Sequence, residues 1–367
     1  MEERLKSLEQ QVQQLAQENA GLKQQLGVKD PAAPVPVVIQ PGGNESKLII
    51  GGFLHAQAEF GRAADARWSG VHDRFFFRRA RVYVAGSFTE DIDFKAELDL
   101  QGNTLSAGTG QLARGNEIYI GWHRYPLASF RFGQLKAAYG SEQLASDTKV
   151  PTVERFQAND RLTDSRQLAV SVAGESPDRM FTYLAVVADG NGVNVSANDN
   201  SKFQKSARVT FTPLAAKGQK LVFGVNGLWA DDANVTKAGL GFAGNTFTGR
   251  RDAWGVDADW TVGALELSTE LLREHFAPAG AAAFDATGWH ATAAYFVVPA
   301  KLQAVVRREA FDPTTMLAGN TATSWTFGLN YFLRGDDLKL MVDYVIGRVP
   351  GATDDGGRLL TRMQVVF

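Results

Sequence analysis

Two arginines of the stretch FFFRRARVYV, residues 75–84, stand two positions apart at Arg79 and Arg81. If this stretch is a β-strand, both side chains lie on one face together with Tyr83, because alternate residues of a strand share a face. A guanidinium group donates parallel hydrogen bonds to the oxygens of an anion and does not deprotonate. Such a face has the chemistry that oxyanion binding needs, provided that this face of the strand meets water.

Charged residues recur on one face of other alternating stretches. In DIDFKAELDL, residues 91–100, the odd positions are charged and the even positions are apolar. The same alternation assigns these bases to charged faces: Arg79, Arg81, Lys95, Arg131, Arg208 and Arg307. It assigns these acids: Asp91, Asp93, Glu97, Asp99, Glu117, Asp257, Asp259, Glu266 and Glu270. A row of anion-binding groups and a wide mixed-charge surface both fit this pattern, and any single arginine could be a solvated side chain paired with an acid.

The elements that must position these side chains are short strands. From about residue 47 to residue 367 there is almost no helical periodicity, and alternating stretches are interrupted by Gly, Asn, Asp and Pro at fairly even intervals. One example is WTFGLNY, residues 325–331, in which large apolar residues alternate with Thr326 and Asn330. We count about sixteen such strands, an even number of the kind that closed antiparallel barrels use.

Two architectures produce such strands: a soluble β-sandwich, whose apolar face is the core, and a transmembrane barrel, whose apolar face meets lipid. Three features favour the barrel. The charged faces are too dense for the exterior of a sandwich but suit a wet lumen, and the chain ends on an alternating strand whose last residue, Phe367, resembles the C-terminal strand of bacterial outer-membrane proteins. Aromatic residues also occur near strand ends, where interfacial girdles place them: Trp122, Trp229, Trp254, Trp260, Trp325, Tyr331 and Tyr344.

Composition excludes several other classes of protein. The chain has no cysteine, so it contains neither disulfides nor thiolate metal sites, and its formal charge of −2 gives no electrostatic footprint for nucleic acid. No run of eighteen apolar residues is present, which excludes a transmembrane helix. The five histidines are widely spaced, and GLGFAG, residues 239–244, lacks the strand and helix of a nucleotide-binding loop. We therefore expect no catalytic residues, no metal and no cofactor.

The N-terminal segment is predicted to be a separate unit. Leu5, Leu8, Val12, Leu15, Asn19, Leu22 and Leu26 follow the three-four spacing of a coiled-coil seam, so residues 1–28 are interpreted as an α-helical coiled coil that trimerises or tethers the protein. A single amphipathic helix lying on its own domain is the alternative. Residues 29–46, rich in Pro and Gly, are interpreted as a linker, and residues 47–367 as the barrel. Met1 leads directly into EERLKSLEQQ, so we expect a mature chain with an added initiator Met rather than a signal peptide.

The chain resembles the phosphate-selective porin O/P family of trimeric bacterial outer-membrane channels. The stretches that carry the resemblance are FFFRRARVYVAGSFTEDIDFKAELDL (75–100), FRFGQLKAAYGSEQLASDTKVPTVERF (130–156), ARVTFTPL (207–214), AAYFVVPAKLQAVVRREAFDP (293–313), TFGLNYFLRGDDLKLMVDY (326–344) and the terminal strand. The resemblance implies an all-β fold, a 16-stranded antiparallel transmembrane β-barrel preceded by a coiled coil. It also implies a homotrimer, with each pore narrowed by a loop that folds inward after the fifth strand, at roughly residues 136–155.

Carried over from the family, the arginine at FRRA (Arg79), Lys136, Arg155 and Asp99 are candidate constriction residues. The stretch GQLKAAYGSE departs from the family pattern, which often has an aromatic residue and a proline after the lysine, so the path of the loop is open. Together with the bases assigned by alternation, the candidate pore residues are Arg79, Arg81, Asp99, Arg131, Lys136, Arg155 and Arg208.

These observations predict a passive channel of the bacterial outer membrane that prefers small, phosphate-like anions. Its expected partners are two further copies of the chain, outer-membrane lipid, small anions or polar solutes, and a periplasmic or cell-wall partner of the coiled coil. Three alternatives stay open: a non-selective or sugar-permeable pore of the same fold, a structural envelope protein that tethers the outer membrane, and a soluble β-sandwich binding module.

Overall fold

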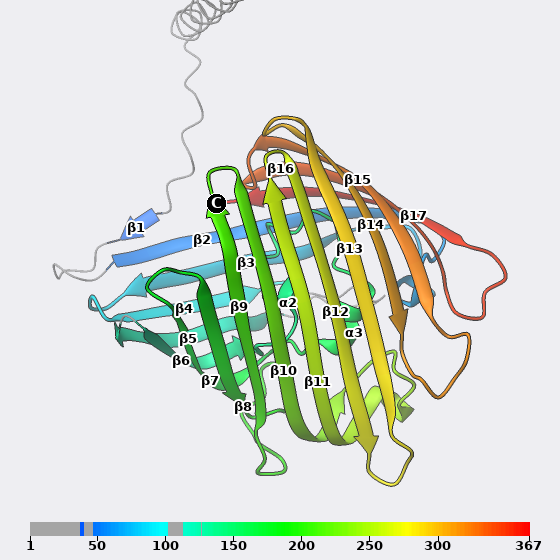
Figure 1. The fold of residues 1–367 in the computed structure, drawn as a ribbon, viewed down its shortest axis with the longest axis horizontal. Coiled ribbons are helices and arrows are strands. Elements are labelled where there is room, and N and C mark those ends of the chain that lie inside the picture. The colour runs from blue at the N-terminus through cyan, green and yellow to red at the C-terminus, as the bar shows by residue number, and fades with distance from the viewer. Residues whose placement is uncertain (1–36, 40–46, 102–112, 126) are drawn as a thin grey trace, which may run out of the picture. The chain divides into compact units, whose positions relative to one another are not determined.

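The computed structural model describes residues 37–39, 47–101, 113–125 and 127–367. The predicted coiled coil of residues 1–28 lies outside these ranges. Within them, no helix is long and apolar enough to cross a bilayer. The described chain consists mainly of long strands, arranged around a central space in Figure 1.

Sixteen strands form one sheet in which each strand is antiparallel to its neighbours, and the sheet closes where β17 pairs with β2. The sixteen strands are β2 (Lys47–Gly61), β3 (Arg74–Ser87), β4 (Ile92–Asp99), β5 (Arg114–Tyr125), β6 (Ala128–Lys136), β7 (Arg166–Glu175), β8 (Phe181–Ala188), β9 (Gln204–Ala216), β10 (Gln219–Thr236), β11 (Thr246–Val262), β12 (Leu265–Pro278), β13 (Phe284–Val298), β14 (Leu302–Asp312), β15 (Ala322–Arg334), β16 (Leu338–Arg348) and β17 (Gly356–Val366). Closure leaves no long open edge, and it confirms the predicted 16-stranded antiparallel barrel.

The two ends of the barrel differ in their connections. At one end, here called the turn end, strands are joined by tight turns such as 217–218 and 263–264. Gly218 and Gly263 adopt φ values of +74° and +59° there, in the left-handed region that two-residue hairpins need. The opposite end, here called the loop end, carries longer connections such as 62–73 and 137–165.

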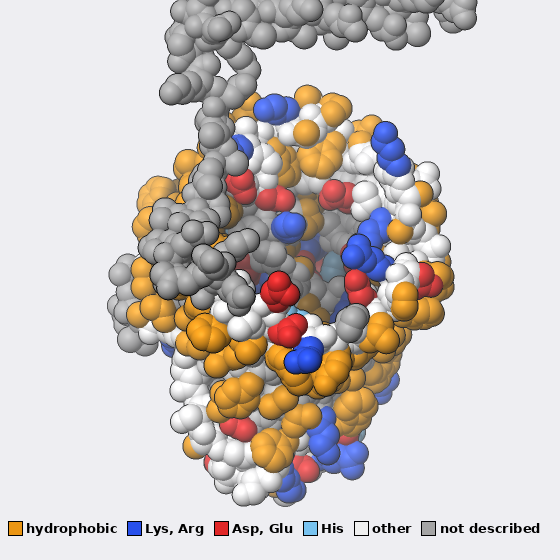
Figure 2. All heavy atoms as spheres, turned by 90° about the vertical axis from the view of Figure 1, so that its left-hand side faces the viewer, with side chains coloured by type: hydrophobic (Ala, Val, Ile, Leu, Met, Phe, Trp, Pro, Cys, Tyr) orange, Lys and Arg blue, Asp and Glu red, His pale blue; other side chains and the backbone are white. Residues whose placement is uncertain are grey.

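Side-chain alternation places the apolar face outside and the charged face inside. In β16, Leu340 and Val342 are more than two-fifths exposed on the outer wall, whereas Lys339 and Asp343 on either side of them are almost fully buried in the interior. Figure 2 shows the same division, with hydrophobic side chains over the outer wall and charged ones inside a hollowed mouth. The assignment of sides predicted from the sequence is therefore confirmed.

A β-bulge in β3 changes this alternation at one point. The register between β2 and β3 shifts after the pair His55 and Arg79, and Ala56 is next paired with Phe77. Arg78 is the extra residue of the bulge, so Arg78 and Arg79 are both buried inside the barrel. Strict alternation predicts only Arg79 and Arg81 on the inner face, and the bulge adds a third arginine.

A short strand, β1 (Val37–Ile39), lies within the segment interpreted as a linker. It pairs with Leu48–Ile50 of β2, beyond the point where β17 ends its own pairing at Phe53. The physical reason is that β17 leaves the first residues of β2 with unpaired backbone groups, and a β-branched tripeptide can occupy that edge. The barrel sheet thus has a seventeenth strand that sequence analysis did not predict.

Two connections at the loop end pack inside the barrel rather than above it. Residues 62–73, which contain the 3-10 turn η1 (Ala66–Trp68), place Trp68 against Met341 and Leu360 of the inner wall. Residues 137–165 contain two short helices, α2 (Ser141–Leu144) and α3 (Gln157–Leu162). A further 3-10 turn, η2 (Ala243–Asn245), lies between β10 and β11. The predicted inward loop after the fifth barrel strand is confirmed, and it extends ten residues beyond the predicted end.

Candidate functional site

The loop of residues 137–165, here called the inner loop, is held in the lumen by an apolar cluster. Tyr139, Phe156 and Leu162 of the loop are fully buried. They pack against inward-facing residues of β10–β14: Leu228, Ala230, Phe247, Ala253, Leu272, Phe276, Phe284, Ala286 and Phe311. Burying three large side chains supplies several kcal/mol, at roughly 1.5–3 kcal/mol each, which fixes the loop on this side of the barrel.

Polar contacts fix the backbone of the inner loop at its start. Gly140 adopts φ +85°, and a Cβ there would lie 2.6 Å from Thr163 Cγ2, so the turn into α2 favours glycine. The amides of Ser141 and Glu142 then donate to the two carboxylate oxygens of Glu270 on β12. Because both amides are at the beginning of α2, Glu270 satisfies backbone donors that the helix itself leaves open.

The far side of the inner loop is bonded to β15–β17. The Val153 amide donates to Asp343 Oδ2 at 2.7 Å, and Lys339 Nζ donates to the Thr148 carbonyl at 2.8 Å. Asn330 Nδ2 donates to the Pro151 carbonyl at 2.7 Å. The loop therefore contacts both β10–β14 and β15–β17, and it divides the lumen.

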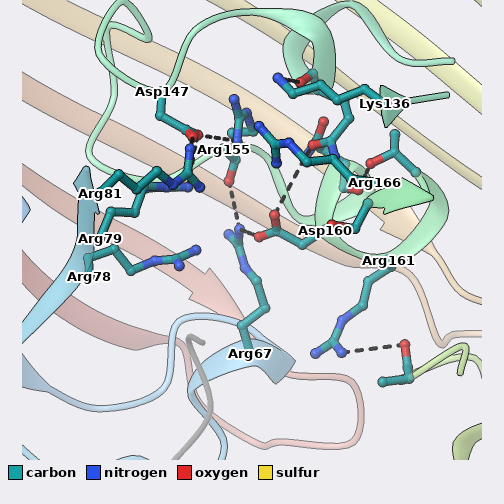
Figure 3. A pocket seen from close by; sticks show the side chains of 15 residues that line it. Arg67, Arg78, Arg79, Arg81, Lys136, Asp147, Arg155, Asp160, Arg161 and Arg166 are labelled. Atoms are coloured by element: carbon teal, nitrogen blue, oxygen red, sulfur yellow. Dashed lines mark hydrogen bonds and ion pairs between the residues drawn. The ribbon is translucent and has the colours of Figure 1, made fainter. Parts of the chain in front are cut away.

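A strongly basic cavity of about 330 Å³ lies between the inner loop, β3, β6 and β7 (Figure 3). Its charged lining consists of eight cations and two carboxylates. The cations are Arg67, Arg78, Arg79, Arg81, Lys136, Arg155, Arg161 and Arg166, and the carboxylates are Asp147 and Asp160. In Figure 3 the three β3 arginines project into the cavity from one side, with Arg79 and Arg81 beside Asp147, and Arg166 and Lys136 lie on the other side.

Asp147 is the anion at the centre of this cavity. It contacts three guanidinium groups: Arg155 at 2.6 Å, Arg79 at 3.1 Å and Arg81 at 2.5 Å. Burial alone would raise the pKa of Asp147, but the positive charges of Arg155, Arg79 and Arg81 outweigh burial and hold that pKa well below its usual range. Asp147 is therefore ionised at neutral pH and bridges three arginines.

Several of the other cations are also paired. Arg155 donates to the carbonyls of Glu142 and Ala145, so it braces the inner loop from within. Arg67 pairs with Asp65 and Asp160 at 2.8 Å and 2.9 Å. Arg78 pairs with Glu154 at 3.0 Å. The Arg78 and Arg362 charges outweigh the effect of burial and lower the pKa of Glu154.

Three cations of the cavity form no ion pair among the described residues: Lys136, Arg161 and Arg166. Lys136 Nζ donates to loop carbonyls, the shortest contact being 2.7 Å to Gln143. Arg161 donates to the Ala238 carbonyl at 3.4 Å. The Nε atoms of Arg161 and Arg166 have no hydrogen-bond partner within the described ranges. These groups can give hydrogen bonds and charge to a solute.

A second cavity, of about 360 Å³, shares Arg81, Lys136, Asp147 and Arg166 with the first. It is also lined by Lys95, Glu97, Glu117 and Arg131. Arg131 stacks on Tyr119, with the guanidinium carbon 4.4 Å from the ring centroid. The two cavities therefore adjoin each other at these four charged side chains.

A third cavity, of about 230 Å³, is bordered by the start of the inner loop and by β11–β13. It is acidic, with Glu142, Asp259, Glu266 and Glu270 against the single cation Lys149. One stretch of loop thus borders a basic cavity and an acidic one.

The structure brings most of the predicted pore residues together. Arg79, Arg81, Lys136 and Arg155 line the basic cavity, and Arg131 lines the neighbouring one. Asp99 lines neither cavity and accepts from Arg81 Nε at 3.0 Å. Arg208 lies apart on β9, where it pairs with Asp257 at 2.5 Å.

Sequence analysis missed Arg67, Arg78, Arg161 and Arg166 as cavity residues. Arg67 and Arg161 lie in connections, where alternation predicts nothing, and the bulge hides Arg78. Alternation along β7 would place Arg166 on the outer face together with Leu168 and Val170. Arg166 is the first residue of β7, however, and its side chain lines the basic cavity.

Comparisons with known proteins agree with this architecture. A sequence profile described as "Phosphate-selective porin O and P" matches residues 54–367. Porin O of Pseudomonas aeruginosa PAO1 is 23% identical, over 88% of this chain and 89% of that protein. Among solved structures, an anion-selective porin from Comamonas acidovorans superposes with a TM-score of 0.61 at 12% identity, covering 88% of this chain and all of that one. The trimer form of OmpT from Vibrio cholerae gives a TM-score of 0.58 at 12% identity, covering 88% and 100% of the two chains.

Proposed function

The chain belongs to the phosphate-selective porin O and P family and forms a porin of the bacterial outer membrane, and on this premise we propose that its pore prefers small, phosphate-like anions. Family and fold point to a channel rather than an enzyme. The Comamonas acidovorans relative carries the description anion-selective, which supports the same preference by similarity.

One observation carries the proposal: eight cations and two carboxylates line the basic cavity, and Lys136, Arg161 and Arg166 form no ion pair among the described residues. A solute oxyanion can take the place of the missing carboxylates, because guanidinium and ammonium groups bind phosphate through charge-assisted hydrogen bonds. Cations are repelled by the same excess charge. In this proposal, Arg79 and Arg81 raise the local anion concentration while Lys136 and Arg166 contact the solute.

The remaining candidate residues have supporting roles in the proposed pore. Arg155 and Asp147 fix the inner loop, and Asp99 orients Arg81. Arg131 extends the positive field into the second cavity, and Arg208 tunes the charge of the opposite wall through its pair with Asp257.

Planar-bilayer recording tests the anion preference directly. In a potassium chloride gradient the reversal potential of the wild-type channel is expected to lie toward the chloride equilibrium potential. Single-channel current in chloride is expected to fall when phosphate is added, because phosphate binds the cavity more tightly and passes more slowly. A reversal potential near zero, with no effect of phosphate, would contradict the proposal.

A non-selective or sugar-permeable pore of the same fold is the second candidate, and the acidic cavity beside the inner loop favours it. With carboxylates on one side of the loop and cations on the other, a solute of either charge meets an attractive surface. A small permeability ratio between chloride and potassium, together with permeation of neutral sugars in liposome swelling, would support this candidate.

We also propose that the protein is a homotrimer assembled or tethered through residues 1–28. The heptad pattern supports a coiled coil, and the OmpT relative is described in a trimer form. Deletion of residues 1–36 keeps β1 and is expected to leave single-channel conductance intact. If cross-linking detects no trimers of the deletion variant, residues 1–28 drive assembly. If cross-linking still detects trimers, the segment serves as a tether to the periplasm or cell wall.

A further inference from the structure

The outer wall of β10–β15 carries a groove with a single charged side chain. The groove holds about 540 Å³ and is lined by Trp260, Leu267, Val306 and Trp325 around a floor of small residues. Arg308 of β14 is the only ionisable residue in this lining. Neighbouring strands in Figure 1 form the surface, which is continuous across the sheet.

The strand register explains the shape of the groove. One row across the sheet pairs Ala258 with Thr269, Thr269 with Ala291, Ala291 with Arg308, and Arg308 with Trp325. The first three side chains of this row are small and the last two are large. The row therefore forms an apolar trough of small side chains that ends at a guanidinium group.

Arg308 faces outward whereas its neighbour Arg307 faces inward. Arg307 is buried, pairs with Glu142 and donates to Thr292 Oγ1 at 2.9 Å. Arg308 makes one contact of note, a cation–π interaction with Trp325 at 5.1 Å from the ring centroid. It forms no ion pair or hydrogen bond with a side chain in the described part of the chain.

Other outward arginines on these strands have carboxylate partners. Arg250 on β11 pairs with Asp252 at 2.8 Å, and Arg273 on β12 pairs with Asp285 at 2.9 Å. Arg308 lies four residues before the end of β14, about 14 Å along the strand from the loop end at ~3.4 Å per residue. The inter-strand register aligns Arg273 with Asp312, the last residue of β14, through Thr287, so Arg308 lies four residues farther from the loop end than Arg273. An uncompensated charge destabilises a barrel most toward the middle of the membrane.

We propose that this groove binds an anionic, phosphate-bearing lipid of the outer leaflet, with the phosphate on Arg308 and an acyl chain along Ala291 and Ala258. The charge of Arg308 and the apolar trough beside it together match an amphiphile with a negative head. Short turns of outer-membrane barrels face the periplasm, so the loop end, to which Arg308 lies nearer, faces the outer leaflet. A guanidinium stacked on tryptophan is oriented in advance for phosphate oxygens.

Native mass spectrometry of the full chain in detergent tests the proposal, with phosphatidylglycerol and phosphatidylcholine as the lipid probes. The wild type is expected to retain one phosphatidylglycerol per protomer and to bind phosphatidylcholine weakly. Arg308→Gln is expected to bind phosphatidylglycerol ~10-fold more weakly, as for the loss of one charge-assisted contact. The matched control Arg273→Gln removes an outward arginine that has its own carboxylate, and it is expected to keep wild-type binding.

A second variant separates the headgroup from the acyl chain. Ala291→Phe keeps Arg308 but fills the floor of the trough, and it is expected to weaken binding while leaving single-channel conductance unchanged. Equal binding of both lipids by wild type and Arg308→Gln would overturn the proposal. Displacement of the lipid by inorganic phosphate would show that the trough adds nothing, and lipid-independent dissociation of oligomers by Arg308→Gln would assign the groove to a second copy of the chain.

Discussion

The two sides of the inner loop use their charges differently. On the side of β10–β14 and β16, carboxylates are bonded to the protein itself: Glu270 accepts two loop amides, Asp343 accepts the Val153 amide, and Asp257 pairs with Arg208. On the side of β3, β6 and β7, three cations lack a carboxylate partner among the described residues. Glu270 and Asp343 therefore anchor the loop through its backbone amides, whereas the basic side keeps three cations without a carboxylate partner within the described ranges.

The difference arises because acidic side chains accept hydrogen bonds, whereas basic side chains donate them. A loop offers free backbone amides, which are donors, and carboxylates accept from them. Arginine and lysine can reach only carbonyls or acids, and the acid at the centre of the basic cavity, Asp147, is already shared by three guanidinium groups. A mixed-charge lumen can in this way present mainly positive charge to a passing solute.

Reversing the charges of Lys136 and Arg166 should have the largest effect on the difference between the two sides of the inner loop. The double change Lys136→Glu and Arg166→Glu leaves six cations and four carboxylates around the basic cavity, so the permeability ratio of chloride to potassium is expected to fall at least ~10-fold. Reversal potentials in a salt gradient measure it. Lys205→Glu, an exposed change on the outside of β9, is the control; an equal shift in both proteins would mean that total charge rather than the cavity sets selectivity.

Removing the Asp147 carboxylate should increase the excess positive charge of the basic cavity and lower the stability of the protein. Asp147→Asn frees Arg79, Arg81 and Arg155, so anion selectivity is expected to rise. The same change leaves the buried Arg79 guanidinium without an ion pair among the described residues, whereas Arg81 keeps Asp99 and Arg155 keeps its loop carbonyls, and thermal unfolding is expected to report a loss of about 1–3 kcal/mol. Stability equal to wild type, with unchanged selectivity, would show that Asp147 does not order the three arginines.

The anchoring role of the acidic side can be broken at Glu270. Glu270→Ala leaves the amides of Ser141 and Glu142 without their acceptor, so the start of the inner loop is expected to loosen and single-channel noise to increase. Glu266→Ala is the matched control, since it removes a carboxylate of the same acidic cavity that bonds Gln303 instead of the loop. If both variants are equally noisy, charge loss alone explains the result.

Lowering the pH within the neutral range should have the smallest effect, because it leaves thermal stability nearly unchanged. Asp147 and Glu154 have folded-state pKa values below the unfolded value of about 4, so the stability they contribute is complete above that pH and is lost as the pH falls through the folded pKa. Thermal stability is expected to decline below about pH 4, and less steeply in Asp147→Asn. A decline of equal slope in the variant would assign the acid sensitivity to other groups.

Much of the fold could be predicted from local sequence. Alternation alone placed Leu340 outside and Asp343 inside, because side chains of a strand alternate between faces and only one face tolerates charge. The resemblance to the family predicted the inward loop, and alternation placed Arg79 and Arg81 on the lumen side. The identities of the missed arginines could not be predicted, because a bulge shifts Arg78 and because Arg67 and Arg161 lie in connections without periodicity.

The sequence by itself determined which face of each strand meets water and which meets lipid, since that property depends only on residue type and a period of two. Only the tertiary structure decided which charged side chains are paired within the protein and which have no carboxylate partner among the described residues. Partners such as Asp147 with Arg79, or Glu270 with the Ser141 amide, are brought together by the path of the inner loop, and that path depends on apolar packing of Phe156 and Leu162 against strands more than sixty residues away in the chain.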